Sequence, residues 1–396
     1  MSTPEIYLDN AATSWPKPSV VREALDDYFG AAGGNPGRSA HRMSVAAARL
    51  VEAARSGLAE LLGIADPGRI ALTRNATEAL NLALYGLLRP GDHVVTTSVE
   101  HNSMMRPLRH LEAQGVELTV LPCAPDGSLD ADDVRRALRP DTRLLATIHG
   151  SNVTGALMPV EQLAALAREL EVPYLLDASQ TAGTVPIDVS ALGVDLLAFP
   201  GHKGLLGPTG TGGLYVREGL ELAPLLRGGT GSDSALERQP EFMPDAYESG
   251  TPNVLGLAGL AAGVSFLVER GVAHIAAHER ELREQFYAGA AASPGIRLYG
   301  PGAGEACCGV VSFNVQGLTP SEVSTILDQS FGILARPGLH CAPGAHRTIG
   351  TFPTGTVRFG FGWANTEAEV ALALRALEEI AAWARLQESE QVSYAG

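Results

Sequence analysis

The sequence predicts an α/β protein in which a large domain, built on a mostly parallel and doubly wound sheet, precedes a smaller α+β domain. Apolar runs of strand length alternate with helical patterns between residues 69 and 216, as in βαβ units. Most of these runs are apolar on both faces, which indicates strands buried between two layers of helices. After residue 255 long helical patterns precede further strands, an order typical of a domain with an antiparallel sheet.

Each element of the large domain is expected from the spacing of its apolar residues. Strands are predicted at 70–73, 93–97, 117–121, 144–149, 174–177, 196–199 and 214–216. Helices are predicted at 18–29, 77–88, 103–114, 131–138 and 160–170. The last of these repeats apolar residues at the spacing of one helix face.

The smaller domain is expected to span residues 256–396, after a large domain at 17–255. Its helices are predicted at 255–269, 272–291, 320–329 and 367–386, and its strands at 296–299, 310–314, 333–335 and 357–361. Residues 1–16 should pack on this domain or across the active site. The stretches 232–248 and 343–356 are polar or rich in Gly and Pro, so we expect them to be mobile.

Composition narrows the class of partner. Of 396 residues, 45% are hydrophobic and 18% are charged, which is typical of a globular chain. The formal net charge of −15 speaks against nucleic acid or an anionic membrane as the main partner. The first residues lack a basic and an apolar segment, and no apolar run reaches membrane-spanning length, so a cytoplasmic location is expected.

The cysteines indicate neither a metal site nor a disulfide framework. They stand at 123, 307, 308 and 341, and no two of them have C-x-x-C spacing. Neighbouring Cys307 and Cys308 cannot form an ordinary unstrained disulfide. Cys341 differs in lying in a Gly/Pro-rich segment, Arg336-Pro-Gly-Leu-His-Cys341-Ala.

Asp177 and Lys203 predict a site for pyridoxal 5'-phosphate (PLP). Asp177 ends an apolar strand, and Lys203 follows the next strand in Gly201-His-Lys203-Gly. Carboxyl ends of strands face the ligand crevice of an open α/β sheet, so the two side chains can meet at one planar cofactor. PLP needs a lysine for a Schiff base and an acid that keeps its ring nitrogen protonated. Taken singly, Asp177 could cap a turn and Lys203 could be a solvated loop lysine.

Three further segments follow strands in the same way. Asn75-Ala-Thr77-Glu opens a helix, where free backbone N–H groups bind phosphate, although a simple N-cap explains it equally well. His101 could stack on a ring or move protons, but a lone histidine is more often a polar loop residue. Asn152 is similarly placed and ambiguous by itself.

Together these segments resemble a known family. In order they are Leu8-Asp-Asn-Ala-Ala-Thr13, Asn75-Ala-Thr-Glu78, Glu100-His-Asn102, Ser151-Asn-Val-Thr-Gly155, Asp177-Ala-Ser-Gln180, Gly201-His-Lys203, Ser249-Gly-Thr-Pro-Asn253 and Arg336-x-Gly-x-His-Cys341. The set resembles the class V aminotransferase family of fold type I PLP enzymes, and most of all the SufS-like branch of the cysteine desulfurases. The resemblance spans about residues 6 to 380.

The resemblance implies a role for each matching residue at the cofactor. Lys203 would carry the Schiff base, Asp177 would pair with the ring nitrogen, and Gln180 would bind the phenolic oxygen. His101 would stack on the ring and assist proton transfer. Asn152 would also lie against the cofactor.

The resemblance also implies how phosphate and substrate are held. Backbone at Ala76 and the side chains of Thr77 and His202 would bind the phosphate. Thr251 would reach the phosphate of a partner subunit, which implies a homodimer with shared active sites.

The carboxylate of L-cysteine would be oriented by Asn152 and by a bidentate fork from Arg358, with Arg336 also at the substrate.

The reaction implied by the resemblance depends on Cys341. A thiolate there would attack the sulfur of bound L-cysteine, leaving alanine and a persulfide that passes to an acceptor protein or a small thiol. A thiol near cationic groups ionises more readily, and Arg336 and His340 are near in sequence. A buried structural cysteine is the alternative, and it is the preferred interpretation for Cys123 and for the 307–308 pair.

Two positions depart from the family pattern. Pro200 stands where the family commonly has a phosphate-binding serine, and Leu339 where a histidine is often found. Other functions stay open at this point. One is a selenocysteine lyase, a cysteine sulfinate desulfinase or another class V lyase. Another is a non-catalytic scaffold with the PLP fold that serves sulfur transfer.

Overall fold

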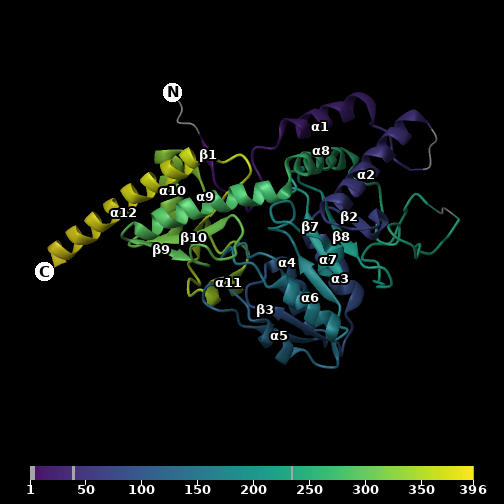
Figure 1. The fold of residues 1–396 in the computed structure, drawn as a ribbon, viewed down its shortest axis with the longest axis horizontal. Coiled ribbons are helices and arrows are strands. Elements are labelled where there is room, and N and C mark those ends of the chain that lie inside the picture. The colour runs from purple at the N-terminus through teal and green to yellow at the C-terminus, as the bar shows by residue number, and fades with distance from the viewer. Residues whose placement is uncertain (1–4, 38–40, 233–234, 396) are drawn as a thin grey trace.

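The computed structural model describes residues 5–37, 41–232 and 235–395. Within them a seven-stranded sheet has the order β2-β8-β7-β6-β5-β3-β4 (Figure 1). Only β8 runs antiparallel to its neighbours, so the expected mostly parallel sheet is confirmed. The strands are β2 (Ile70–Thr73), β3 (His93–Thr97), β4 (Glu117–Leu121), β5 (Thr142–Ile148), β6 (Tyr174–Asp177), β7 (Leu196–Pro200) and β8 (Gly212–Val216).

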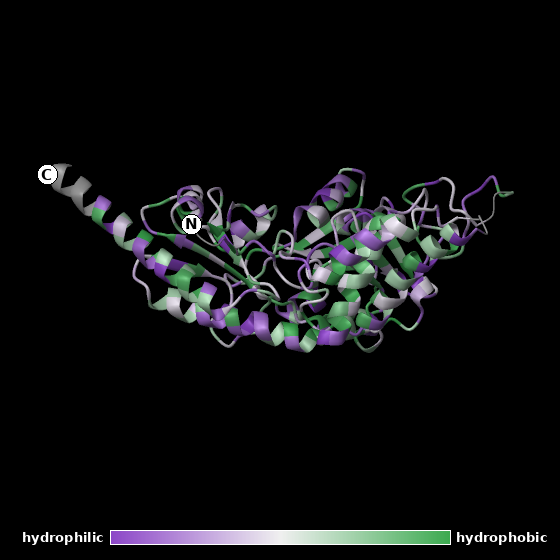
Figure 2. Cartoon of the chain, turned by 90° about the horizontal axis from the view of Figure 1, so that it is seen from above, coloured by the Kyte–Doolittle hydropathy of each residue, from purple (hydrophilic) through white to green (hydrophobic). Residues whose placement is uncertain are grey.

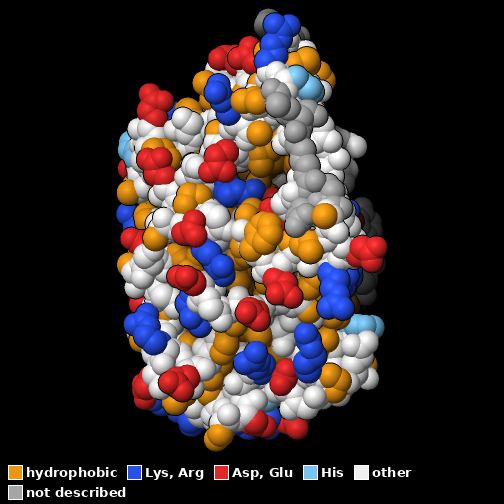
Figure 3. Space-filling view, turned by 90° about the vertical axis from the view of Figure 1, so that its right-hand side faces the viewer, with side chains coloured by type: hydrophobic (Ala, Val, Ile, Leu, Met, Phe, Trp, Pro, Cys, Tyr) orange, Lys and Arg blue, Asp and Glu red, His pale blue; other side chains and the backbone are white. Residues whose placement is uncertain are grey.

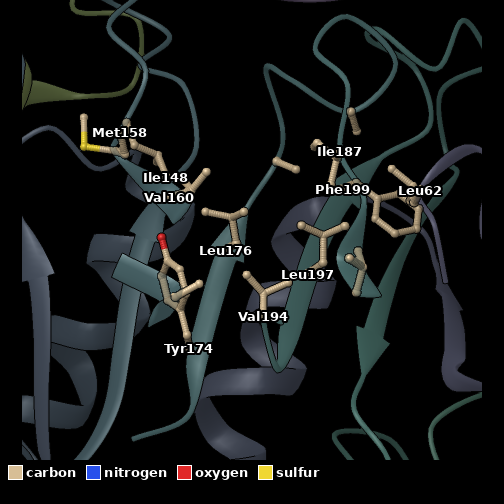
Figure 4. Packing of buried hydrophobic residues seen from close by; sticks show 14 of the residues in the cluster. Leu62, Ile148, Met158, Val160, Tyr174, Leu176, Ile187, Val194, Leu197 and Phe199 are labelled. Carbon is tan, nitrogen blue, oxygen red and sulfur yellow. The ribbon is translucent and has the colours of Figure 1, made fainter. Parts of the chain in front are cut away.

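Helices cover both faces of this sheet. They are α3 (Ala76–Leu87), α4 (Asn102–Glu112), α5 (Ala131–Ala137), α6 (Val160–Glu169) and α7 (Val189–Leu192). Successive residues of a strand enter different cores: Leu175 packs with α3 and α4, whereas Leu176 packs with α6. Figure 4 shows Leu176 and Leu197 side by side on neighbouring strands, in the core that includes α6. This double burial explains why the strands are apolar on both faces.

A layer of three helices completes the large unit. It consists of α1 (Ser19–Ala31), α2 (Arg42–Leu61) and α8 (Val254–Arg270), in which α1 and α2 each pack against α8 (Figure 1). Leu257, Leu260 and Val264 of α8 belong to the core of the large unit. The start of the smaller domain expected at residue 256 falls inside α8, a helix that packs against α1 and α2. The helix α2 was not anticipated, and the short helix η1 (Pro67–Arg69) links it to β2.

The smaller unit has a four-stranded antiparallel sheet, in the order β12-β13-β10-β9. Its strands are β9 (Ile296–Tyr299), β10 (Val310–Val315), β12 (Arg336–Gly338) and β13 (Thr356–Gly360). The helices α9 (Val272–Ala292), α10 (Pro320–Phe331) and α12 (Glu367–Ala395) accompany them, and α12 projects from the body (Figure 2). The core centres on the rings of Phe286, Phe313 and Phe359, whose centroids lie 4.9 to 5.7 Å apart.

The N-terminal segment lies on the smaller unit. There β1 (Ile6–Tyr7) pairs in parallel with β11 (Ile333–Leu334), and Ile6 and Leu8 enter the core of that unit. Within the described residues, no single helix has the length and apolarity needed to cross a membrane. Only α8 and α9 together, bent by 83° at their junction, pass the same test as a pair.

One of the two stretches expected to be mobile has regular structure. Residues 343–356 begin with helix α11 (Pro343–Thr348), in which Ala345 and His346 are fully buried. The other stretch, 232–248, lies partly outside the described residues, and its part from 235 onward contains neither helix nor strand.

Candidate active site

A cavity opens at the carboxyl ends of β3, β5, β6 and β7, where the sheet presents polar side chains. It brings together most of the residues that the sequence assigned to a cofactor. Its lining includes Ala76, Thr77, His101, Asn152, Asp177, Gln180, Pro200, His202 and Lys203. These residues come from segments that are far apart in the chain, and the sheet alone brings them to one place.

Lys203 lies on a tight turn after β7, flanked by two glycines that the packing requires. A Cβ on Gly201 would lie 2.1 Å from Oγ1 of Thr211, and one on Gly204 would lie 2.5 Å from the carbonyl oxygen of Ala182. Burial lowers the pKa of Lys203 to about 8, and nearby arginines act in the same direction against the carboxylate of Asp177. At pH 7 roughly a tenth of the amine is therefore neutral, and this fraction is nucleophilic and basic.

Asp177 ends β6 with its side chain buried. Oδ1 accepts hydrogen bonds from the backbone N–H and the hydroxyl of Ser179. Oδ2 is buried and has no hydrogen-bond partner among the described residues. Burial raises the pKa of Asp177, while Ser179 and Lys203 act against that rise. A buried carboxylate oxygen without a donor indicates that a ligand supplies one.

His101 caps the N-terminus of α4 with its ring. Nδ1 accepts a hydrogen bond of 3.0 Å from the backbone N–H of Ser103, and the Ser103 hydroxyl lies 2.7 Å from the same nitrogen. Burial, followed by the charges of Lys203 and nearby arginines, lowers the pKa of His101 to about 4. The ring is therefore neutral near pH 7, and its proton sits on Nε2.

The N-terminus of α3 forms another part of the cavity. Asn75 caps the helix by accepting from the N–H of Glu78, and Ala76 and Thr77 line the cavity at the first turn. Such N–H groups favour an anion. His202 lies nearby, with Nδ1 3.2 Å from the hydroxyl of Thr13, and burial lowers its pKa to about 4.

Pro200 also lines this part of the cavity, so the position has no hydroxyl to offer an anion. Gln180 donates from Nε2 to the carbonyl oxygen of Ala11 at 3.0 Å, which fixes its amide.

Arg358 lies beside the cavity on β13 and is 1% exposed. Nη2 forms an ion pair of 2.7 Å with Asp9, and Nη1 donates to the backbone oxygen of Asn152. Nε is buried and has no partner among the described residues. Asn152 in turn donates from Nδ2 to the carbonyl oxygen of His340 at 2.7 Å. The unpaired Nε of Arg358 is a donor that fits a substrate carboxylate. Asn152 links Arg358 to the loop of Cys341.

Cys341 is exposed on a turn that its neighbours hold in place. The φ angles of His340 and Cys341 are 47° and 59°, a left-handed conformation that is costly outside glycine. The N–H of Asn102, next to His101, donates to the carbonyl oxygen of Cys341 at 2.8 Å. Nη2 of Arg336 lies 3.5 Å from Sγ. A negative charge on Sγ would raise the pKa of Lys203 and of Arg358, so the sulfur lies within electrostatic reach of both.

His340 does not provide the cationic neighbour that its place in the sequence suggested. Its ring is buried, and Nε2 contacts the carbonyl oxygen and the hydroxyl of Thr356, each at 3.1 Å. Burial lowers the pKa of His340 to about 2, so the ring is neutral. Arg336 is therefore the cation in contact with the Cys341 thiol.

The structure keeps Thr251 out of this cavity. Thr251 is exposed in a separate, wide cleft beside α2 and α3, which Leu225 and Leu226 also line. The end of the molecule formed by the large unit carries apolar side chains among charges of both signs (Figure 3). Thr251 is therefore not among the residues that line the cavity of Lys203 in its own chain.

Four residues around the site received no role from the sequence. Ser103 and Ser179 hold His101 and Asp177, and Asp9 pairs with Arg358. Glu100 is buried under the cavity, where Oε1 accepts from Thr97 and from the N–H of Ile148. A signal existed for Asp9, Glu100 and Ser179, since all three lie in the segments that carry the family resemblance. Among the described residues, no group of three or more His, Cys, Asp or Glu could hold a metal ion.

Comparison with known proteins gives the family. The family model Aminotransferase class-V matches residues 6–372. A probable cysteine desulfurase of Methanothermobacter thermautotrophicus is 36% identical over 382 residues, which cover 95% of this chain and 94% of that protein. The cysteine desulfurase of Haloferax volcanii is 34% identical over 380 residues, covering 93% and 88% of the two chains.

Comparison with solved structures also finds cysteine desulfurases. The apo cysteine desulfurase of Thermococcus onnurineus NA1 has a TM-score of 0.90 and 36% identity, covering 96% of this chain and 98% of that one. The cysteine desulfurase CsdA of Escherichia coli has a TM-score of 0.85 and 30% identity, covering 95% and 96%. The chain belongs to the class V aminotransferase family, and its fold is that of fold type I PLP enzymes.

The residues at the cavity fit the cofactor on which this family depends. The unpaired Oδ2 of Asp177 suits the N–H of a protonated pyridine ring, and the partly neutral amine of Lys203 suits the cofactor aldehyde. The open first turn of α3 suits a phosphate group. We therefore expect Asp177, Lys203 and Thr77 to hold PLP, with His101 at the ring.

Proposed function

We propose that the chain is a cysteine desulfurase, which converts L-cysteine to L-alanine and passes the sulfur through a persulfide on Cys341. The observation that carries this proposal is the placement of Cys341. An exposed thiol in contact with Arg336 lies on a fixed turn whose backbone binds α4 next to His101. The similarity to cysteine desulfurases over nearly the whole chain supports the same activity.

Substrate binding is assigned to the wall formed by the smaller unit. Arg358 holds the carboxylate of L-cysteine through its unpaired Nε and the adjacent side of the guanidinium. Asn152 keeps the loop of Cys341 next to this carboxylate site, because it contacts both Arg358 and His340. The substrate sulfur is thereby directed toward the Cys341 thiol.

Proton transfer at the substrate Cα is assigned to Lys203. Its lowered pKa leaves part of the amine free to take the proton, as a general base requires. Bound PLP would supply a ring that accepts the electrons left at Cα. His101, neutral and with its proton on Nε2, can donate a hydrogen bond at the cavity without adding a positive charge.

Sulfur transfer is assigned to Cys341. Its thiolate attacks the substrate Sγ, a sulfur–sulfur bond forms, and the substrate Cβ–Sγ bond breaks with its electrons left on carbon. Two protons delivered to carbon then complete alanine. Arg336 stabilises the thiolate before the attack and the persulfide after it. A sulfur-acceptor protein or a small thiol removes the sulfur from the exposed turn.

We infer a homodimer with shared active sites. Thr251 lines a wide cleft outside its own chain's cavity, and the exposed apolar side chains of Leu225 and Leu226 line the same cleft. Exposed apolar groups of this kind favour contact with another protein surface. In such a dimer Thr251 supplies one phosphate contact to the partner site.

A comparison of substrates tests the proposal against other class V lyases. The parent enzyme and a Cys341→Ala variant are given L-cysteine, L-selenocysteine and L-cysteine sulfinate, and alanine is measured. We expect the variant to lose turnover of L-cysteine and to retain more turnover of the other two, whose leaving groups depart without thiolate attack. Cys123→Ala, which removes a thiol whose pKa burial raises to about 11, is the control and should behave as the parent.

Full turnover of L-cysteine by the Cys341→Ala variant would rule out the proposed role of the thiol. Absence of turnover of all three amino acids by the parent, with PLP bound, would instead favour a non-catalytic scaffold.

A further inference from the structure

Residues 9–17 form a strap that crosses between the two units at the active site. The strap is defined by these residues and carries side chains that contact both walls of the cavity. On the side of the smaller unit, Asn10 donates from Nδ2 to the carbonyl oxygen of Gly360 at 2.9 Å and to Asn365 at 3.0 Å. The indole N–H of Trp363 donates to the carbonyl oxygen of Pro16 at 2.9 Å.

On the side of the large unit, the strap binds the turn that carries Lys203. The hydroxyl of Ser14 donates to the carbonyl oxygen of Lys203 at 2.8 Å. The ammonium of Lys17 donates to the carbonyl oxygen of His202 at 2.8 Å, and the hydroxyl of Thr13 donates to the same oxygen at 3.0 Å. The strap is thus tied to the backbone of the turn at two successive residues.

Asp9 begins the strap and is the only acidic group that the described residues pair with Arg358. The carboxylate lies 2.7 Å from Nη2 of Arg358, whose side chain is 1% exposed. A guanidinium buried to this degree needs a counter-charge, and a fixed partner also sets the plane of its fork. Nη1 is fixed by the backbone of Asn152, so Asp9 and Asn152 together orient the guanidinium and leave Nε unpaired.

We propose that Asp9 is a positioning residue that aims Arg358 at the carboxylate of an amino-acid substrate and, through the strap, sets its distance from Lys203. This proposal rests on the proposed function, because it assigns Arg358 to the substrate carboxylate. Asp9 itself does not contact the substrate. Its removal should therefore weaken recognition of the carboxylate and leave the chemistry at Lys203 largely intact.

The test compares two ligands that differ only in the carboxylate. L-cysteine and cysteamine are titrated into the PLP-loaded parent and an Asp9→Asn variant, and binding is read as a change in cofactor absorption. We expect the apparent dissociation constant for L-cysteine to rise by about tenfold or more, with no comparable change for cysteamine. In turnover, KM for L-cysteine should rise by a similar factor while kcat falls much less.

Glu169→Gln is the matched control, because Glu169 belongs to an exposed ion pair with Arg135 on α5 and α6. It should behave as the parent with both ligands. An unchanged affinity of Asp9→Asn for L-cysteine, or an equal loss for both ligands, would overturn the proposal.

Asp9→Glu keeps the charge and covers the case in which Asp9→Asn does not retain PLP. This variant must show the same selective loss for L-cysteine to a smaller degree, and an equal loss for cysteamine would count against the proposal. Failure of the parent to release alanine would refute the proposed function alone, because the two binding titrations do not depend on turnover.

Discussion

At the scale of single residues, the cysteines differ in their surroundings more than in their chemistry. Burial raises the pKa of Cys123 to about 11 and of Cys308 to about 12, and it also raises the pKa of Cys307. Such thiols stay protonated and are poor nucleophiles. Cys341 alone among them is exposed and contacts an arginine.

The assignment of Lys203 as the residue that holds the cofactor predicts the effect of replacing it. Lys203→Ala should lose the visible absorption band of lysine-bound PLP and all detectable alanine formation. Lys17→Ala, which removes the other half-buried lysine near the turn, should retain the band. Absorption spectra of the purified variants after incubation with PLP decide this, and a persistent lysine-type band in Lys203→Ala would contradict the assignment.

Glu100 gives a prediction about pH. Burial raises its pKa to about 8, so the folded state keeps a proton that the unfolded state loses near its ordinary value of 4.5. Stability from this group is full below that value and is lost as the pH rises toward 8. Glu100→Gln removes this loss. The free energy of unfolding of the parent should therefore fall relative to that of the variant by up to about 1.4 kcal/mol per pH unit.

Urea unfolding of the parent and the variant at several pH values from 4.5 to 8 measures the difference. Glu23→Gln, which changes an exposed carboxylate on α1, serves as the control and should track the parent at every pH. If the stability difference between parent and Glu100→Gln stays constant over this range, Glu100 is ionised in the folded protein.

Much of the site at residue scale could be predicted from the sequence. Asp177 ends a strand, Lys203 and His101 each follow one, and the carboxyl ends of parallel strands meet at one edge. Contacts of Cys341 could not be predicted in this way, because they depend on the angle of a loop. The ring of His340 points inward to Thr356, whereas the guanidinium of Arg336 reaches the thiol. Both residues are close to Cys341 in the sequence, so sequence distance does not distinguish them.

At the scale of elements, α8 supports the turn that carries Lys203. A Cβ on Gly263 would lie 2.7 Å from the carbonyl oxygen of Leu205 and 3.0 Å from the carbonyl carbon of Leu206. Backbone atoms cannot yield as a side-chain end can. Gly263→Ala should therefore lower the free energy of unfolding by about 1–3 kcal/mol and reduce turnover.

The matched control is Gly30→Ala in α1, where a Cβ would meet no atom within 4 Å. This change should leave turnover unaltered and can add up to about 1 kcal/mol through helix propensity. Thermal or urea unfolding with an alanine assay measures both variants. Equal stability of Gly263→Ala and the parent would show that α8 is not in tight contact with the turn.

Elements were predictable where their periodicity was strong. The strands of the large sheet lie within a residue or two of their predicted positions. The helix α2 was missed because a Gly/Pro-rich segment precedes it, and α11 because its six residues are too short to show a period. The packing partners of α8 could not be predicted for a different reason: a helical pattern does not reveal which neighbour its apolar face packs against.

At the scale of the whole molecule, the position of Thr251 predicts complementation between subunits. Lys203→Ala and Thr251→Ala chains are mixed, exchanged by mild denaturation and refolding, and titrated with PLP. In a mixed dimer one site combines the intact Lys203 of one chain with the intact Thr251 of the other. We expect that fraction to bind PLP as tightly as the parent and to recover activity.

Complementation requires shared sites, so a mixture whose PLP affinity and activity are only the average of the two variants would argue against them. The mass of the parent in solution provides an independent check. A chain of 41.4 kDa that stays monomeric at working concentration would leave Thr251 without a partner phosphate.

In the proposed reaction sulfur leaves L-cysteine through Cys341, and a single-turnover experiment tests this step. PLP-loaded enzyme is mixed with L-cysteine in the absence of any acceptor, alanine is counted per site, and peptides are analysed by mass spectrometry. We expect one alanine per site in the first turnover and one added sulfur atom on the peptide that contains Cys341. Alanine formed with no added sulfur on that peptide, or with the sulfur on another cysteine, would contradict it.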